Sequence, residues 1–74
     1  MHTFADIIDL WPKPSPVTFA EDIGEESGTC RAWRNRNTLP DRVWRKVVAA
    51  AEKREIEGVT LEVLARIAEK QAAA

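Results

Sequence analysis

The chain has 74 residues, 45% of them hydrophobic and 31% charged. This length and this hydrophobic content are sufficient for one small folded domain spanning residues 1–74. A single cysteine excludes an internal disulfide, and no apolar run approaches the roughly 20 residues that a membrane-spanning helix needs. The N-terminus has no basic start followed by a long apolar stretch, so we expect no secretion signal and a cytoplasmic location.

The net charge of −1 is unevenly distributed along the chain. Residues 1–29 contain one lysine and six acidic residues, a net charge of −5, whereas residues 30–46 contain six basic residues and one acidic residue, a net charge of +5. Residues 47–74 carry −1. Because a local basic patch, rather than the total charge, binds phosphate, the middle segment is the candidate for contact with nucleic acid.

The first predicted helix runs from Thr3 to Trp11, with a capping hydroxyl at its start and Pro12 after its end. Apolar residues recur in it at i, i+3, i+4 and i+7, the spacing of one helix face. These residues are Phe4, Ile7, Ile8 and Trp11. We expect the face to be buried, with Trp11 either in the core or at a dimer surface.

A second helix is predicted over residues 16–23, because Ser15 offers a capping hydroxyl and Pro16 suits the first helical position. Gly24 follows, where a left-handed residue ends a helix at low cost. A third helix is predicted over residues 27–36. It is amphipathic, with two inward apolar residues and several outward arginines.

Two further helices are predicted after a break at residues 37–40: one from Pro40 to Arg54, and one from Leu61 to Lys70 that is capped by Thr60. Residues 71–74 are expected to fray. The inward stripe expected in the last helix is Leu61, Leu64, Ala65 and Ala68, widened by Val63 and Ile67. This spare apolar surface, with Ile56 and Val59, favours a dimer interface over simple coverage of the core. No segment has the pattern of a strand, so the predicted fold is all-α with five helices.

Residues 16–35 carry the spacing that a helix-turn-helix needs. Counted from Pro16, the fifth residue is alanine, the ninth is glycine, and the fourth, eighth, fifteenth and eighteenth are apolar. The residues at these positions are Phe19, Ala20, Ile23, Gly24, Cys30 and Trp33. The segment resembles the helix-turn-helix of Cro and repressor proteins from temperate phages, and residues 37–44 resemble the Pro-x-x-x-Trp start of the next helix in small Cro-like regulators. The resemblance implies a Cro-like fold, double-stranded operator DNA as partner and a homodimer.

In this interpretation the third helix enters the major groove. The residues expected to contact bases are Ser27, Gly28, Arg31 and Asn35. The residues expected to contact phosphates are Arg34, Arg36, Arg42 and Arg45, and a contact from Lys46 is less strongly indicated. A solvated helix face and surface ion pairs are the alternatives for these side chains.

One departure from the family pattern is the pair Glu25 and Glu26, which stands where an apolar and then a small polar residue are usual. We expect Glu25 at the rim with its carboxylate in water, and Glu26 close to the DNA at the start of the third helix, where it would repel phosphate. Other acids, such as Asp6 and Asp9, are expected to be solvent-exposed.

No catalytic, metal-binding or cofactor-binding set emerges from the sequence, since Cys30 occupies an inward apolar position and the one histidine is His2. We therefore expect no enzyme activity, no cofactor and no small-molecule ligand. The hypothesis is a Cro-like transcriptional regulator, most simply a repressor. The alternative is a protein-interaction module that keeps a helix-turn-helix scaffold without binding DNA, which the overall acidity and the two glutamates favour.

Overall fold

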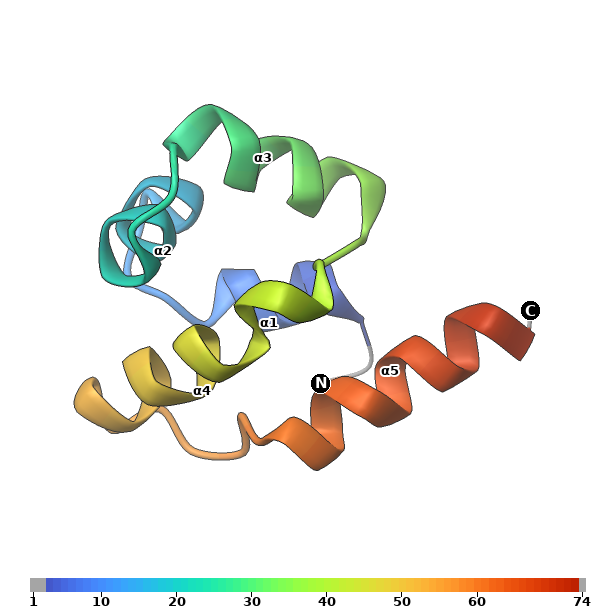
Figure 1. Ribbon diagram of the computed structural model, residues 1–74. Coiled ribbons are helices and arrows are strands. Elements are labelled where there is room, and N and C mark those ends of the chain that lie inside the picture. The colour runs from blue at the N-terminus through green and yellow to red at the C-terminus, as the bar shows by residue number, and fades with distance from the viewer. Residues whose placement is uncertain (1–2, 74) are drawn as a thin grey trace.

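Five α-helices and one short 3₁₀ turn make up the chain in the computed structural model, which describes residues 3–73 (Figure 1). The elements are α1 (Phe4–Asp9), α2 (Ser15–Ile23), α3 (Ser27–Arg36), the 3₁₀ turn η1 (Asp41–Val43), α4 (Trp44–Lys53) and α5 (Leu61–Ala73). No strand occurs within the described residues, so the predicted all-α, five-helix fold is confirmed. Met1, Ala74 and the single histidine, His2, lie outside the described part of the chain.

The start of α1 agrees with the sequence prediction. Thr3 is the N-cap, and its hydroxyl oxygen accepts a hydrogen bond from the Asp6 N–H at 3.1 Å. The helix ends at Asp9, two residues before the predicted end at Trp11. Trp11 N–H bonds to the Ile8 carbonyl, three residues back, so the chain leaves the helix through a tighter turn.

The predicted cap of the second helix is wrong. α2 begins at Ser15, with Pro14 in the capping position and no side-chain cap bond. The buried Ser15 hydroxyl instead donates to the Trp11 carbonyl at 2.8 Å. The hydroxyl therefore stabilises the connection between α1 and α2 rather than the start of α2.

Gly24 ends α2 in the left-handed conformation that the sequence predicts, with φ 74° and ψ 32°. The Glu25 N–H bonds to the Ala20 carbonyl at 3.0 Å and closes the end of the helix. Only residues 24–26 separate α2 from α3. This short turn fixes the start of α3 close to the end of α2.

The boundaries of the last two helices differ from the predicted ones. The predicted helix from Pro40 to Arg54 begins with the 3₁₀ turn η1, and its α-helical part, α4, runs only from Trp44 to Lys53. The last helix continues past Lys70 to the end of the described chain.

Asn37, at the break after α3, contacts three helices through its capping role and its hydrogen bonds. It is the C-cap of α3 in a left-handed conformation, φ 55°. Its Oδ1 accepts from the Ala5 N–H of α1 at 3.0 Å, and its carbonyl accepts from Gln71 Nε2 of α5 at 2.7 Å. The expected fraying at residue 71 is therefore wrong, because Gln71 is helical and hydrogen-bonded.

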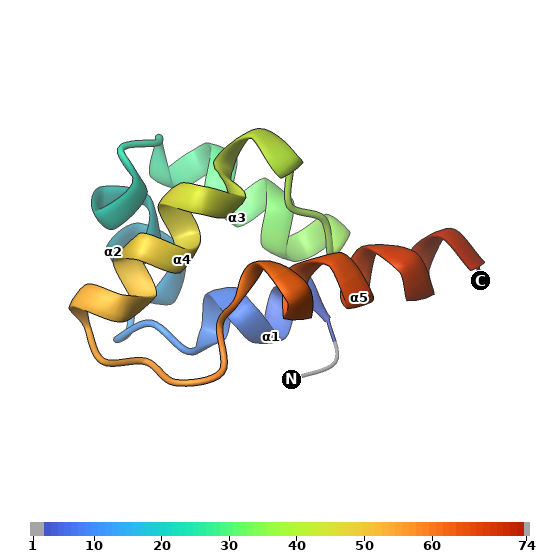
Figure 2. The same ribbon diagram turned by 60° about the horizontal axis from the view of Figure 1, so that its bottom comes forward.

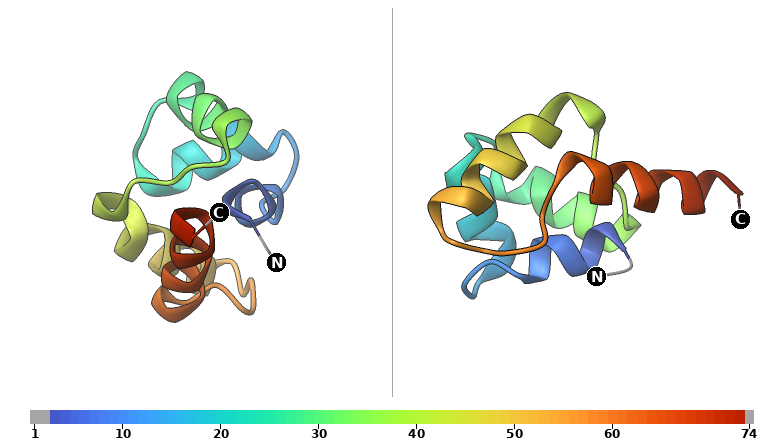
Figure 3. Two further views of the ribbon diagram at one scale, coloured as in Figure 1. Left: turned by 90° about the vertical axis from the view of Figure 1, so that its right-hand side faces the viewer. Right: turned by 90° about the horizontal axis from the view of Figure 1, so that it is seen from below.

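The other helices pack around the pair formed by α2 and α3. In Figure 1, α2 is viewed nearly along its axis while α3 runs across the view, so the two helices cross steeply. α1 contacts both of them, α4 packs on α2, and α5 packs on α4. Figures 2 and 3 show the C-terminal part of α5 projecting beyond the other helices. The projection lengthens the molecule, whose principal extents are 31, 24 and 20 Å.

The core uses the apolar face that the sequence predicts in the first helix and the inward positions that it predicts in the second and third. Trp11 is 1% exposed and meets Phe19 edge-on, with ring centroids 4.8 Å apart, so it belongs to the core rather than to an open surface. Trp44 is only partly buried. Its ring lies against Phe4, and its Nε1 donates to the Leu39 carbonyl at 3.0 Å. The other buried hydrophobic residues of α1, α2, α3, η1 and α4 are Ile7, Ile8, Ala20, Ile23, Cys30, Trp33, Val43, Val47, Ala50 and Ala51.

The predicted inward stripe of the last helix is partly wrong. Leu64 and Ile67 are the buried residues of α5, whereas Leu61 is 45% exposed. Val59 is buried and Ile56 packs against the core, so both serve the monomer rather than the dimer surface expected of them. Leu61 is the one large hydrophobic residue of the described part of α5 that remains exposed.

Candidate nucleic-acid interface

The outward face of α3 carries the four residues expected to contact bases. Arg31 and Asn35 are one helical turn apart and exposed, Gly28 is exposed, and Ser27 is partly buried. Within the described residues, Arg31 and Asn35 have no hydrogen bond or ion pair to another side chain, and a Cβ added at Gly28 would meet nothing within 4 Å. The face is therefore open to an incoming ligand.

The opposite face of α3 is buried as predicted and anchors the helix. Cys30 is inaccessible and Trp33 is 8% exposed. Burial, with a smaller contribution from Glu25, raises the pKa of the Cys30 thiol to about 11. The thiol is thus neutral at physiological pH and acts as a small apolar side chain.

Arg34, one of the four expected phosphate contacts, is paired within the protein. Its Nε and Nη2 donate to the two carboxylate oxygens of Asp9 at 2.6 and 3.0 Å. This bidentate pair raises the pKa of the Arg34 guanidinium above its ordinary value. Asp9 was expected to be exposed, and it is 43% exposed, but it is not free.

Arg42 is also paired. Its Nη1 donates to Glu25 Oε2 at 3.1 Å, and its guanidinium carbon lies 5.9 Å from the centroid of the Trp33 ring. The Glu25 side chain is only 19% exposed. The expectation that its carboxylate stands in water is therefore wrong, because the carboxylate is largely covered and accepts a hydrogen bond from Arg42 of η1.

The remaining basic residues near α3 are free. Arg36 at the end of α3, and Arg45 and Lys46 at the start of α4, are exposed and form no side-chain hydrogen bond or ion pair within the described part of the chain. Glu26 is exposed at the N-cap of α3 and makes no side-chain capping bond. Of the basic residues in this segment, Arg36 on α3 and Arg45 and Lys46 on α4 are thus free, whereas Arg34 and Arg42 are paired.

Sequence reasoning missed a third acidic–basic contact, which lies away from α3. Asp22 of α2 accepts hydrogen bonds from the Arg54 guanidinium, at the end of α4, and from Trp11 Nε1 at 2.8 Å. The bonds from Arg54, and then that from Trp11, hold the pKa of the Asp22 carboxyl below its ordinary value. Because Asp22 and Arg54 are 32 residues apart, no local pattern could have indicated the pair.

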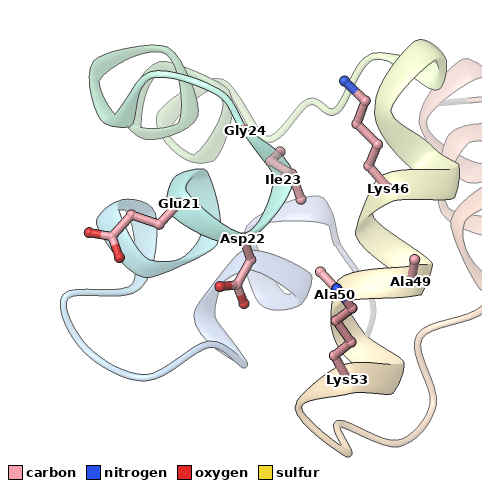
Figure 4. Close-up of a pocket in the computed structure, with 8 residues that line it drawn as sticks. All are labelled: Glu21, Asp22, Ile23, Gly24, Lys46, Ala49, Ala50 and Lys53. Atoms are coloured by element: carbon pink, nitrogen blue, oxygen red, sulfur yellow. The ribbon is translucent and has the colours of Figure 1, made fainter.

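An open groove of about 410 Å³ lies beside this contact, between the end of α2 and α4 (Figure 4). Lys46 and Lys53 project from α4 at opposite ends of the groove, with Ala49 and Ala50 between them, while Glu21 points away from α4. No sequence pattern indicates a groove here. Its lining holds charges of both signs and defines no single ligand chemistry.

The described residues contain no group of His, Cys, Asp and Glu side chains that could hold a metal ion. None of the helices within residues 3–73 has the length and apolar character required to cross a membrane. Comparison of the chain with protein-family models, with curated proteins and with solved structures finds no match. The resemblance to Cro-type proteins therefore rests on the residues and spacing of the chain itself.

Proposed function

We propose that this protein binds double-stranded DNA in a sequence-dependent manner, with α3 as the recognition helix, and acts as a small Cro-like transcriptional regulator. The observation that carries the proposal is the exposed, unpaired pair Arg31 and Asn35 on a helix whose other face is locked into the core. Arginine pairs with guanine O6 and N7, and asparagine with adenine N6 and N7, in the major groove.

Two further features support this proposal. The turn that joins α2 to α3 is short and ends α2 with a left-handed glycine, as in helix-turn-helix proteins. Arg36 at the end of α3, and Arg45 and Lys46 at the start of α4, are free cations of the kind that contacts phosphate. Gly28 adds no side chain to the face, which permits a close approach of the backbone to the groove.

The proposal includes an assembly and a mode of action. A homodimer would present two α3 helices about 34 Å apart, one turn of B-DNA, to a near-palindromic operator. Repression would follow from blocking access of the polymerase to a promoter in the cytoplasm of a phage or prophage host. The protein would act by binding alone, without a catalytic step, a cofactor or a small-molecule ligand.

The test is selection of bound duplexes from a randomised DNA library at moderate salt, followed by sequencing. Enrichment of a near-palindrome with half-sites about one helical turn apart supports the proposal in full. Retention without enrichment restricts the function to phosphate-driven binding. Absence of retention at low salt contradicts DNA binding.

A protein-interaction module on the same scaffold is the second candidate. The observation that favours it is the pairing of Arg34 with Asp9 and of Arg42 with Glu25, which removes two of the four expected phosphate contacts. In that case Arg31→Ala would be silent in every DNA-binding assay, and affinity for DNA would show no salt dependence.

A further inference from the structure

The basic residues around α3 fall into two groups that differ in pairing. Arg31, which faces outward from the middle of the helix, is free, whereas Arg34 and Arg42 are each held by a carboxylate from outside α3. Those carboxylates belong to Asp9 at the end of α1 and to Glu25 in the turn before α3. The pairing thus leaves the central arginine, which is suited to read bases, free, and occupies two of the four arginines expected to contact phosphates.

We propose that Asp9 and Glu25 compete with DNA phosphate for Arg34 and Arg42. By occupying these two arginines, the carboxylates weaken the sequence-independent part of DNA binding. This inference rests on the proposed function, because it concerns how strongly the same surface holds DNA. It assigns a role to two acidic residues that the helix-turn-helix pattern does not require.

The geometry at Arg34 supports direct competition. Both Asp9 oxygens are used, by Nε at 2.6 Å and by Nη2 at 3.0 Å, and this is the bidentate arrangement that arginine also forms with phosphate. A phosphate approaching those two nitrogens must displace the carboxylate. Since the two side chains are 41% and 43% exposed, the pair is accessible from solvent and therefore to a phosphate.

The contact at Arg42 has a different geometry, but it also compensates the charge of an arginine that could contact phosphate. Arg42 is 61% exposed, while Glu25 is 19% exposed and therefore held in place by its surroundings. The face of Trp33 lies beside the guanidinium and restricts its orientation further. A phosphate can reach the outer side of Arg42, but it meets a guanidinium whose charge is already compensated.

These two contacts act on the phosphate-driven component of affinity. Contacts to phosphate supply most non-specific binding, whereas contacts to base edges supply sequence discrimination. Compensation of Arg34 and Arg42 reduces the first component and leaves the outer face of α3 unchanged. A small protein with a free Arg36, Arg45 and Lys46 would otherwise hold any duplex more tightly.

The experiment measures binding to a random-sequence duplex by fluorescence anisotropy across a series of salt concentrations, for the wild-type chain, Asp9→Asn and Glu25→Gln. Each amide variant keeps the size of the side chain and removes the competing charge. Each is expected to bind about two- to fivefold more tightly at moderate salt, the worth of a released surface ion pair. The plot of log K against log salt should become steeper by about 0.9 for each arginine released.

Glu62→Gln is the matched control. Glu62 pairs with Arg66 at 2.6 Å within α5, and both side chains are about 70% exposed, so this variant has the same change in net charge and also breaks an ion pair. It lies on a helix that carries none of the proposed DNA contacts. Its affinity and salt slope should stay close to those of the wild type. A circular dichroism melt of each variant checks that the variant remains folded.

A double-mutant cycle then tests whether Asp9 acts through Arg34. In an Arg34→Ala background, Asp9→Asn should no longer increase affinity, because no arginine is left to release. The inference is overturned if the gain persists in that background, if it equals that of Glu62→Gln, or if loss of the carboxylate weakens binding. Wild-type binding with unchanged variants rejects the inference alone, whereas no binding by any chain at low salt rejects the proposed function and the inference with it.

Discussion

The contact between Asp22, Arg54 and Trp11 should make a measurable contribution to folding, and Asp22→Asn isolates it. The substitution keeps the shape of the side chain and an acceptor oxygen, but it removes the negative charge that receives the bonds from Arg54 and Trp11. These three residues connect the segment after α1, the last turn of α2 and the end of α4. A decrease in the free energy of unfolding of Asp22→Asn therefore measures how much this contact stabilises α2, the helix that precedes α3.

The expected cost follows from the exposure of the partners. Arg54 is 36% exposed, so its ion pair with Asp22 contributes as a surface pair does, about 0.2–1 kcal/mol. Trp11 is 1% exposed, and changing its acceptor from charged to neutral removes about half of a charge-assisted bond, on the order of 1 kcal/mol. The free energy of unfolding should thus fall by about 1–2 kcal/mol at pH 7, measured by urea titration with tryptophan fluorescence.

The pH dependence provides the decisive check. Because the Arg54 bond lowers the pKa of Asp22 in the folded state, the carboxylate stabilises the fold above its unfolded-state pKa, and this stabilisation is lost as the pH falls through the lower, folded-state pKa. The difference in unfolding free energy between wild type and Asp22→Asn should be complete at pH 7, begin to shrink near pH 4, where an unfolded-state aspartate takes up its proton, and close only below the folded-state pKa. Glu21→Gln, the neighbouring exposed acid, is the control and should stay within about 0.5 kcal/mol of wild type. A gap that does not shrink as the pH falls from 7 to 2, or that at pH 7 is no larger than the gap of the control, would refute the assigned role of Asp22.

Three further outcomes are expected. Arg31→Ala should weaken binding to a selected operator by about 1–3 kcal/mol and relax one base position, measured by anisotropy on operator variants; equal loss on random DNA would leave only a phosphate contact. Gly24→Ala should destabilise the fold by about 1 kcal/mol because of its positive φ, whereas Gly28→Ala, in helical backbone with open space around it, should stabilise it by about 0.5 kcal/mol in the same urea titration. The thiol of Cys30, buried and with its pKa raised to about 11, should react with a disulfide reagent at pH 8 about a hundredfold or more slowly than in the urea-unfolded chain, and fast reaction would contradict its burial.

The features that the sequence predicts well are those set by residues close together in the chain. The cap at Thr3 depends on a residue three positions away, and the left-handed turn at Gly24 depends on one residue type. The inward positions of Cys30 and Trp33 follow from helical spacing within a single segment. Each of these is determined by local geometry, and the structure agrees with each.

The errors occur where the sequence pattern allows more than one local arrangement. Ser15 has two acceptable partners for its hydroxyl, a helix N–H and the Trp11 carbonyl, and sequence spacing does not decide between them. In the last helix, apolar residues occupy so many positions that several stripes are possible, and packing on α4 selects Leu64 and Ile67 instead of Leu61. The chain after Pro40 first forms a 3₁₀ turn, although the helical spacing of its apolar residues is continuous.

The contacts that set the character of the candidate site were beyond sequence reasoning because they join residues far apart in the chain. Asp9 and Arg34 are 25 residues apart, and Glu25 and Arg42 are 17 apart. Helical periodicity specifies which face a residue occupies, but it does not specify which neighbouring helix that face meets. That choice depends on how α1 and η1 lie against α3, which only the packed structure defines.

These long-range pairs also change the meaning of the charge distribution along the chain. The acidic first segment and the basic middle segment do not form separate surfaces, because Asp9 and Glu25 from the first compensate Arg34 and Arg42 from the second. The excess of positive charge in residues 30–46 is therefore smaller at the surface than the sequence suggests. The free cations of this segment are Arg31 and Arg36 on α3 and Arg45 and Lys46 on α4. An interface on α3 with two of its phosphate contacts compensated depends more on base contacts than on bulk attraction for DNA.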